Sequence, residues 1–204
     1  LGFLFPAFDG RATNIYGALY YTAKPNENHP EFADAIFHTS LPMPATEQKE
    51  TFNNVIGDAL AETCSYPVVR TVHTQLKGLI EEHKASKNPE PLFVSKYEVR
   101  SLLKSCGVPE ERAEKFEEEY DDSFGASTDL RPQVIIDTNR FEVKTSDVSI
   151  KVNPERTDLV ETRVIDGQRY LMILANDHVE VNGITIGFPD KDEDNEAGGQ
   201  PTAQ

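Results

Sequence analysis

The stretch from Phe141 to Ile186 places the strongest constraint on the fold, because its residues alternate as they do in β-strands. Val148, Ile150 and Val152 are separated by polar residues, a period of two that is typical of a strand with one buried and one wet face. Asp166-Gly167 lies between two β-rich runs and predicts a type I′ hairpin, since that turn needs positive φ at both central positions. The stretch is therefore predicted to form an antiparallel β-meander.

The apolar face of such a meander needs a second layer, and the helices with the widest apolar stripes are the natural partners. We therefore expect five side chains of the meander to be buried against Val72, Leu76 or Leu79. These are Val148, Ile150, Val152, Val164 and Leu171.

Length and charge limit the class of protein. The chain has 204 residues and a formal net charge of −15. A chain of this length buries about 70% of its unfolded surface, so neither a disulfide nor a metal is needed to hold it together. A strongly acidic surface disfavours nucleic acid and anionic membranes as partners. No apolar run approaches the roughly 20 residues of a membrane span, so no membrane contact is predicted.

We predict one α+β domain over residues 1–187 and a disordered tail, acidic and then Gly/Pro-rich, over residues 188–204. The first residue is Leu1 and the residues after it already resemble a strand, so we expect the chain to be the C-terminal part of a longer protein. Cys64 and Cys106 have no C-x-x-C spacing and are predicted to be free thiols in a reducing cytosol.

The N-terminal residues predict a β-hairpin, with strands near residues 3–8 and 14–23 and a short helix after it over residues 31–38. The hairpin carries more aromatic surface than it can hide alone, so we expect it to pack on an additional N-terminal region or on a second copy of the chain. The aromatic residues are Phe3, Phe5, Phe8, Tyr16, Tyr20 and Tyr21.

Two amphipathic helices are predicted next, over residues 46–64 and 66–84, packed as an antiparallel pair with Ser65 capping the second. The pattern around Ser95 and Glu98 predicts a capping box.

The helix that begins at this capping box is expected to end at Gly107, and Pro109 to open another in its first turn. That helix carries Ala113, Phe116 and Tyr120 on one side. Residues 134–138 are compatible with either strand or helix.

The sequence contains no motif for catalysis or for metal or nucleotide binding. His29, His38, His73, His83 and His178 have no metal-ligand spacing, and Walker A, Gly-x-Gly-x-x-Gly and Gly-x-Ser-x-Gly patterns are absent. We therefore predict no catalytic residue, no metal and no cofactor.

One polar loop is flanked by strands on both sides and is the candidate binding site, although turn chemistry explains it equally well. It contains Asp9, Arg11, Thr13 and Asn14.

The segment from Ser95 to Asp122 has the outline of a helix-turn-helix. A recognition helix must bring Arg or Lys to phosphates and base edges, whereas the second helix here offers Arg112 and Lys115 among eight carboxylates. It is not predicted to read DNA.

Basic residues scattered over the meander remain as an alternative basic face. They are Arg140, Lys144, Lys151, Arg163 and Arg169.

Several runs of residues carry a family resemblance, at 2–8, 47–52, 141–144, 152–156, 159–163 and 178–183. Over residues 2–187 the chain resembles an uncharacterised family of anaerobic Gram-positive bacteria, named as a domain of unknown function (DUF4317). The resemblance implies a cytoplasmic bacterial protein with an additional N-terminal region and brings no catalytic residue. The order of elements is also similar, more distantly, to nucleoid-associated proteins of the NdpA type.

These observations favour a non-enzymatic cytoplasmic module that binds another protein, its own N-terminal region or a second copy of itself. A nucleoid-associated or nucleic-acid-linked protein is the first alternative. A hydrolase-like enzyme completed by an additional N-terminal region is the second.

Overall fold

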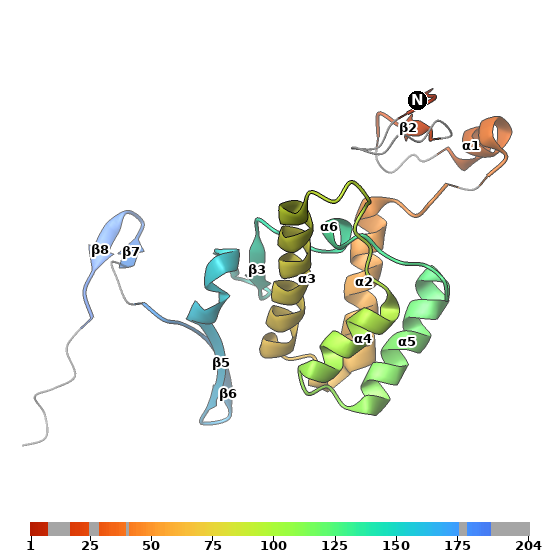
Figure 1. Cartoon of the computed structure of the whole chain (residues 1–204). Coiled ribbons are helices and arrows are strands. Elements are labelled where there is room, and N and C mark those ends of the chain that lie inside the picture. Colours follow the sequence, from red (N-terminus) through yellow and green to blue (C-terminus); the bar gives the residue numbers. More distant parts are fainter. Residues whose placement is uncertain (8–16, 25–28, 40, 176–178, 189–204) are drawn as a thin grey trace, which may run out of the picture. The chain divides into compact units, whose positions relative to one another are not determined.

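The computed structural model describes residues 1–7, 17–24, 29–39, 41–175 and 179–188. An N-terminal hairpin, a helical middle and C-terminal antiparallel strands follow one another along the chain (Figure 1). The predicted α+β class is confirmed. The chain divides into two compact units, Leu1–Thr157 and Asp158–Gln204. The assignment of residues 1–187 to one domain and 188–204 to a tail stays a prediction.

The N-terminal hairpin pairs β1 (Gly2–Leu4) with β2 (Leu19–Tyr21), in the antiparallel register that joins Phe3 to Tyr20. Helix α1 (Pro30–Phe37) packs on it through aromatic rings. Phe3 lies 5.2 Å from Phe37 and 6.3 Å from Phe32 between ring centroids. The predicted hairpin and helix are both present, with strands shorter than the sequence pattern indicated.

Helix α2 (Ala45–Leu60) continues into the 3-10 turn η1 (Ala61–Thr63), and α3 (Tyr66–Ser86) follows. Ser65 has the extended backbone of an N-cap, but its side chain makes no capping hydrogen bond. The predicted side-chain cap is therefore wrong, although the helix begins where it was expected. Pro67 in the first turn of α3 suits that start, because a proline there loses no helical hydrogen bond.

The predicted packing of α2 along α3 is also wrong. Helix α2 packs mainly against α5 (Glu110–Phe124) and α6 (Pro132–Ile135), while α3 packs against α4 (Lys96–Ser105) and α6. Apolar stripes show that a helix has a buried side but not which helix covers it. The shared core contains Phe52, Val55, Ile56, Ala59, Leu60, Val68, Val72, Leu76, Val94, Val99, Leu103, Val108, Phe116, Tyr120, Leu130 and Ile135.

The capping box at the start of α4 is confirmed. The backbone N–H of Glu98 donates to Ser95 Oγ at 3.3 Å, and the backbone N–H of Ser95 donates to Glu98 Oε2 at 2.7 Å. Gly107 follows α4 with a φ of 82°, the left-handed conformation that a glycine permits after a helix.

Helix α5 has Pro109 at its N-cap and buries the three predicted residues Ala113, Phe116 and Tyr120. Helix α6 covers Val134 and Ile135, and Ile136 is already extended, which settles the open choice for this segment. Val94, just before α4, and Leu130, after α5, form an isolated antiparallel β-bridge.

The remaining strands form separate hairpins. Strand β3 (Phe141–Lys144) pairs with β4 (Ser149–Val152), and the 3-10 segment η2 (Pro154–Leu159) follows. In the second unit β5 (Val160–Ile165) pairs with β6 (Gln168–Ile173), and β7 (Val179–Val181) pairs with β8 (Ile184–Ile186). The predicted antiparallel strands are present, but over the described residues they form two-stranded sheets and not one continuous meander.

Both tight turns in the second unit have the expected chemistry. Asp166 and Gly167 have φ values of 51° and 78°, as a type I′ turn requires. Asn182 and Gly183 repeat this geometry with φ values of 51° and 79°.

The predicted burial of the strand residues is largely wrong. Val148 is 53% exposed and Val164 is 71% exposed, while Ile150, Val152 and Leu171 are half-buried. Val72 and Leu76 are buried as expected, but they belong to the helical core. The alternation of a strand shows which face is apolar, and it does not supply the layer that covers it.

Candidate functional site

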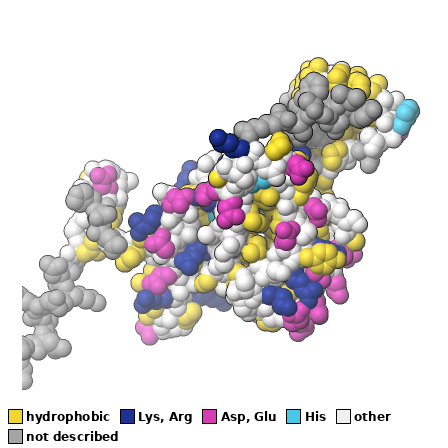
Figure 2. All heavy atoms as spheres, in the orientation of Figure 1, with side chains coloured by type: hydrophobic (Ala, Val, Ile, Leu, Met, Phe, Trp, Pro, Cys, Tyr) yellow, Lys and Arg dark blue, Asp and Glu magenta, His cyan; other side chains and the backbone are white. Residues whose placement is uncertain are grey.

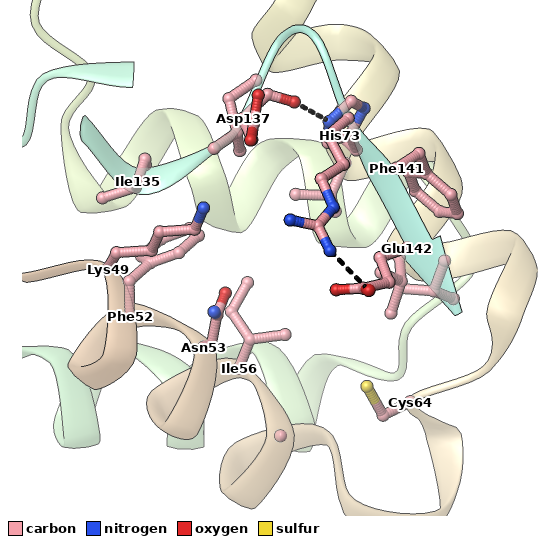
Figure 3. A pocket seen from close by; sticks show the side chains of 16 residues that line it. Lys49, Phe52, Asn53, Ile56, Cys64, His73, Ile135, Asp137, Phe141 and Glu142 are labelled. Atoms are coloured by element: carbon pink, nitrogen blue, oxygen red, sulfur yellow. Dashed lines mark hydrogen bonds and ion pairs between the residues drawn. The ribbon is translucent and has the colours of Figure 1, made fainter. Parts of the chain in front are cut away.

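A pocket of about 500 Å³ opens between α2, α3 and the segment that joins α6 to β3 (Figure 3). This volume lies within the range of about 300–1,000 Å³ that is usual for small-molecule sites. The floor is apolar and the polar groups stand at its edges. The lining residues are Lys49, Phe52, Asn53, Ile56, Gly57, Cys64, Val68, Val69, Val72, His73, Ile135, Ile136, Asp137, Arg140, Phe141 and Glu142.

Helix α2 contributes two adjacent stripes to the pocket. Phe52 and Ile56 are buried and belong to the core. Lys49, Asn53 and Gly57 are spaced four residues apart, so they lie above one another on one face of the helix. In Figure 3 the side chains of Lys49 and Asn53 both point from α2 into the pocket. The helix thus presents an apolar base beside a polar edge.

His73 of α3 fixes the opposite wall. Its Nε2 lies 2.9 Å from the backbone carbonyl oxygen of Asp137, to which it donates in the matching tautomer, as the dashed line in Figure 3 shows. Its ring stands edge-on to Phe141 with 5.1 Å between centroids, and Tyr66 contacts the same phenyl ring at 6.0 Å. The Nδ1 of His73 is buried without a partner among the described residues. His73 and Tyr66 therefore attach the start of β3 to α3.

Glu142 of β3 is paired with the two cations that flank it in the sequence, Arg140 and Lys144. Glu142 accepts hydrogen bonds from Ser149 at 2.8 Å and from Arg140 at 2.6 Å, and Lys144 lies 3.1 Å from its other oxygen. The Ser149 hydroxyl, Lys144 and Arg140, in that order of importance, lower the pKa of Glu142 from 4.5 to about 2. Glu142 is therefore a carboxylate at neutral pH and is unsuited to the role of general acid.

Cys64, at the end of the pocket near η1, is a free and half-buried thiol. Burial raises its pKa, so the thiolate needed for nucleophilic attack is disfavoured. Over the described residues, no three His, Cys, Asp or Glu side chains are grouped to hold a metal ion. Glu142 and Cys64 are therefore poorly suited to act as a general acid and as a nucleophile, respectively.

A second feature is the apolar face of each hairpin in the unit Asp158–Gln204. Residues directly opposite in an antiparallel pair lie on the same face. The β5–β6 register thus places Val160, Val164, Leu171 and Ile173 on one face, together with Thr162 and Arg169. Val160 is buried, but Val164 is 71% and Ile173 56% exposed.

The β7–β8 hairpin has the same organisation on a smaller scale. One face carries Val179, Val181, Ile184 and Ile186, and the other carries the pair of Glu180 and Thr185. Ile184 is 69% exposed. Each hairpin therefore has an apolar face whose residues are largely in contact with solvent.

The N-terminal hairpin exposes apolar side chains too. Figure 2 shows hydrophobic side chains gathered on the surface of the N-terminal hairpin and α1. The exposed residues include Leu1, Phe3, Leu4, Phe5, Leu19 and Tyr21.

Residues 1–184 match the family described as Domain of unknown function (DUF4317). The chain belongs to this family. The match includes the pocket and almost all of the hairpins, and it agrees with the resemblance seen in the sequence. Neither the curated proteins nor the solved structures contain a match to the chain. The more distant resemblance to NdpA-type proteins gains no support.

The loop predicted as the binding site of this DUF4317 chain, with Asp9, Arg11, Thr13 and Asn14, lies outside the described residues. The pocket was not predicted from the sequence, because its residues come from three separate segments. One local signal was available: Lys49, Asn53 and Gly57 recur every four residues beside an apolar stripe.

The carboxylates of α5 are largely engaged in ion pairs. Glu117 lies 3.1 Å from Arg100, Glu119 lies 3.0 Å from Lys115, and Glu110 lies 2.6 Å from Lys104. No described helix combines the length and apolarity needed to cross a bilayer.

Proposed function

We propose that this chain is a non-enzymatic protein-interaction module that joins a larger assembly through the apolar faces of β5–β6 and β7–β8. The observation that carries the proposal is the alignment of branched apolar side chains on one face of each hairpin, with Val164 and Ile184 about 70% exposed.

Isolated two-stranded sheets are marginally stable in water, and a sheet with an apolar face gains stability only when another layer covers it. The opposite face of β5–β6 is mixed: Glu161 is paired to Arg163 at 3.0 Å and the Tyr170 hydroxyl donates to Gln168 at 2.8 Å, while Ile165 and Met172 lie on the same face. The division is clearest in β7–β8, where four branched apolar residues share one face and Glu180 and Thr185 the other, and this is the pattern of a surface that packs against another polypeptide.

The exposed N-terminal aromatic surface supports the same class of function, because patches of this kind usually mark contacts. A cytoplasmic location is part of the proposal and is supported by the free thiols of Cys64 and Cys106. The partner is a protein, and the first possibility to test is association of the chain with a second copy of itself.

The experiment compares two adjacent residues of β8 with opposite orientation. Ile184→Lys places a charge on the apolar face, whereas the matched control Thr185→Lys places it on the polar face. We expect Ile184→Lys to abolish the concentration-dependent increase in mass seen by light scattering, and Thr185→Lys to leave it intact. If the wild-type chain is a monomer, the proposal requires that it binds a hydrophobic dye and that Ile184→Lys reduces that binding.

The contrary result is a monomeric wild-type chain that binds no dye and whose hairpin amides are strongly protected from hydrogen exchange. The apolar faces would then be covered within the chain itself, and the proposal would be overturned.

A further inference from the structure

Among the charged side chains that line the pocket between α2, α3 and β3, that of Lys49 has no hydrogen-bond or ion-pair partner in the described part of the chain. Arg140 donates to Glu142 at 2.6 Å, and Asp137 Oδ1 accepts the backbone N–H of Asn139 at 2.9 Å. Within the described parts of the chain, Lys49 has neither a hydrogen bond nor an ion pair, although its side chain is half-buried and points into the pocket (Figure 3).

A polar group with spare hydrogen-bonding capacity stands next to Lys49. Asn53 lies one helical turn further along α2 and also lines the pocket. Asn53 is exposed, makes no hydrogen bond through its side chain to the described residues, and can donate to a ligand through its NH₂ group. An ammonium and an amide one turn apart are complementary to a carboxylate, which accepts hydrogen bonds on both oxygens.

The third residue of this stripe, Gly57, is a glycine inside a helix, where glycine is less favourable than alanine. Neither a positive φ nor close packing accounts for it, because a Cβ built at Gly57 would meet no atom within 4 Å. A glycine here widens the pocket beside the polar edge. Gly78 of α3 has equally open surroundings but does not line the pocket.

Below this edge the pocket is apolar. The surfaces come from Phe52 and Ile56 of α2, Val68 and Val72 of α3, and Ile135 of α6. Such a lining gives binding energy to a hydrocarbon or aromatic body, and the polar edge fixes its orientation.

We propose that this pocket binds a small amphipathic carboxylate, with its apolar body on the floor and its carboxylate between Lys49 and Asn53. The site lies within the unit Leu1–Thr157, and the hairpin faces proposed above to bind protein belong to the other unit. The two proposals are therefore independent of each other.

The test is a calorimetric titration of the full chain with octanoate, octanol and octylamine, three probes with similar bodies and different heads. Octanoate should bind most tightly and octylamine most weakly. Lys49→Gln should weaken octanoate at least about tenfold, the size expected for a lost charge-assisted hydrogen bond, and leave octanol unchanged. Lys87→Gln, beyond the C-terminal end of α3 and outside the pocket, should leave all three unchanged.

A second pair of variants tests the cavity itself. Gly57→Leu fills space beside the pocket and should weaken octanoate and octanol together, whereas Gly78→Leu should weaken neither. Circular dichroism and thermal melts establish that each variant is folded. No binding of octanoate, equal affinity for octanoate and octylamine, or no effect of Lys49→Gln would each overturn the proposal.

Discussion

The helical middle and the C-terminal hairpins use similar apolar residues in opposite ways. In the helical middle, the stripes of α2, α3, α4 and α5 meet in one core, in which Leu76, Leu103 and Phe116 have no exposed surface. In the hairpins β5–β6 and β7–β8, the apolar faces are equally regular, but Val164 and Ile184 are about 70% exposed.

The difference shows that amphipathic patterning is a property of one element, whereas burial is a property of a pair. The helices are long enough to cover one another, whereas a two-stranded hairpin cannot cover its own apolar face and needs a second layer.

The largest change in the free energy of unfolding is expected when a core side chain is truncated. Phe116→Ala should lower the free energy of unfolding by about 3–5 kcal/mol, and Leu76→Ala by about 2–5 kcal/mol, because both side chains are fully buried. Val164→Ala on β5 should stay within about 0.5 kcal/mol of wild type. Urea denaturation measures all three. A loss of 2 kcal/mol or more at Val164 in the monomer would show that the chain covers this face itself.

A smaller effect is expected at the helix caps, where two serines occupy the same position with different bonding. Ser95→Ala removes a hydroxyl that accepts the Glu98 backbone N–H at 3.3 Å and should cost about 1 kcal/mol. Ser65→Ala removes no capping bond and should cost less than about 0.5 kcal/mol. Equal losses in the two urea melts would contradict the difference in capping.

The β3–β4 hairpin should respond to acid through Glu142. Its pKa is lowered from 4.5 to about 2 in the folded chain, so the ionised form stabilises the fold above pH 4.5. That contribution should disappear as the pH falls from 4.5 towards 2. The carboxyl carbon shift of Glu142, followed by NMR, measures the pKa directly. Ser149→Ala, which removes the largest cause of the shift, should move the pKa back towards 4.5; an unchanged midpoint would rule out that cause.

No measurable effect is expected when duplex DNA is added at physiological salt. DNA binding depends on cations that release counterions from phosphates, and the chain has a net charge of −15. Two residues of the proposed basic face, Arg140 and Lys144, are engaged by Glu142, and Arg163 is engaged by Glu161. Fluorescence anisotropy decides it: micromolar affinity that weakens steeply with salt would favour the nucleic-acid alternative over protein binding.

Local chemistry made much of the fold predictable. The capping box at Ser95, the left-handed Gly107 and the turn at Asp166-Gly167 each depend on the conformational preferences of a few adjacent residues. The buried side of α5 followed from the spacing of Ala113, Phe116 and Tyr120 for the same reason.

The tertiary structure decided what contacts what. Helix α3 was expected to cover α2 and instead packs on α4 and α6, which leaves the pocket between them. Lys49, His73 and Arg140 line one cavity only because of that arrangement, so no local pattern predicts that the three lie together. Sequence by itself determined which elements form and which sides are apolar, because those depend on backbone preference and periodicity. Which apolar sides become buried depends on competition among all elements for the same partners, and only the folded chain resolves that competition.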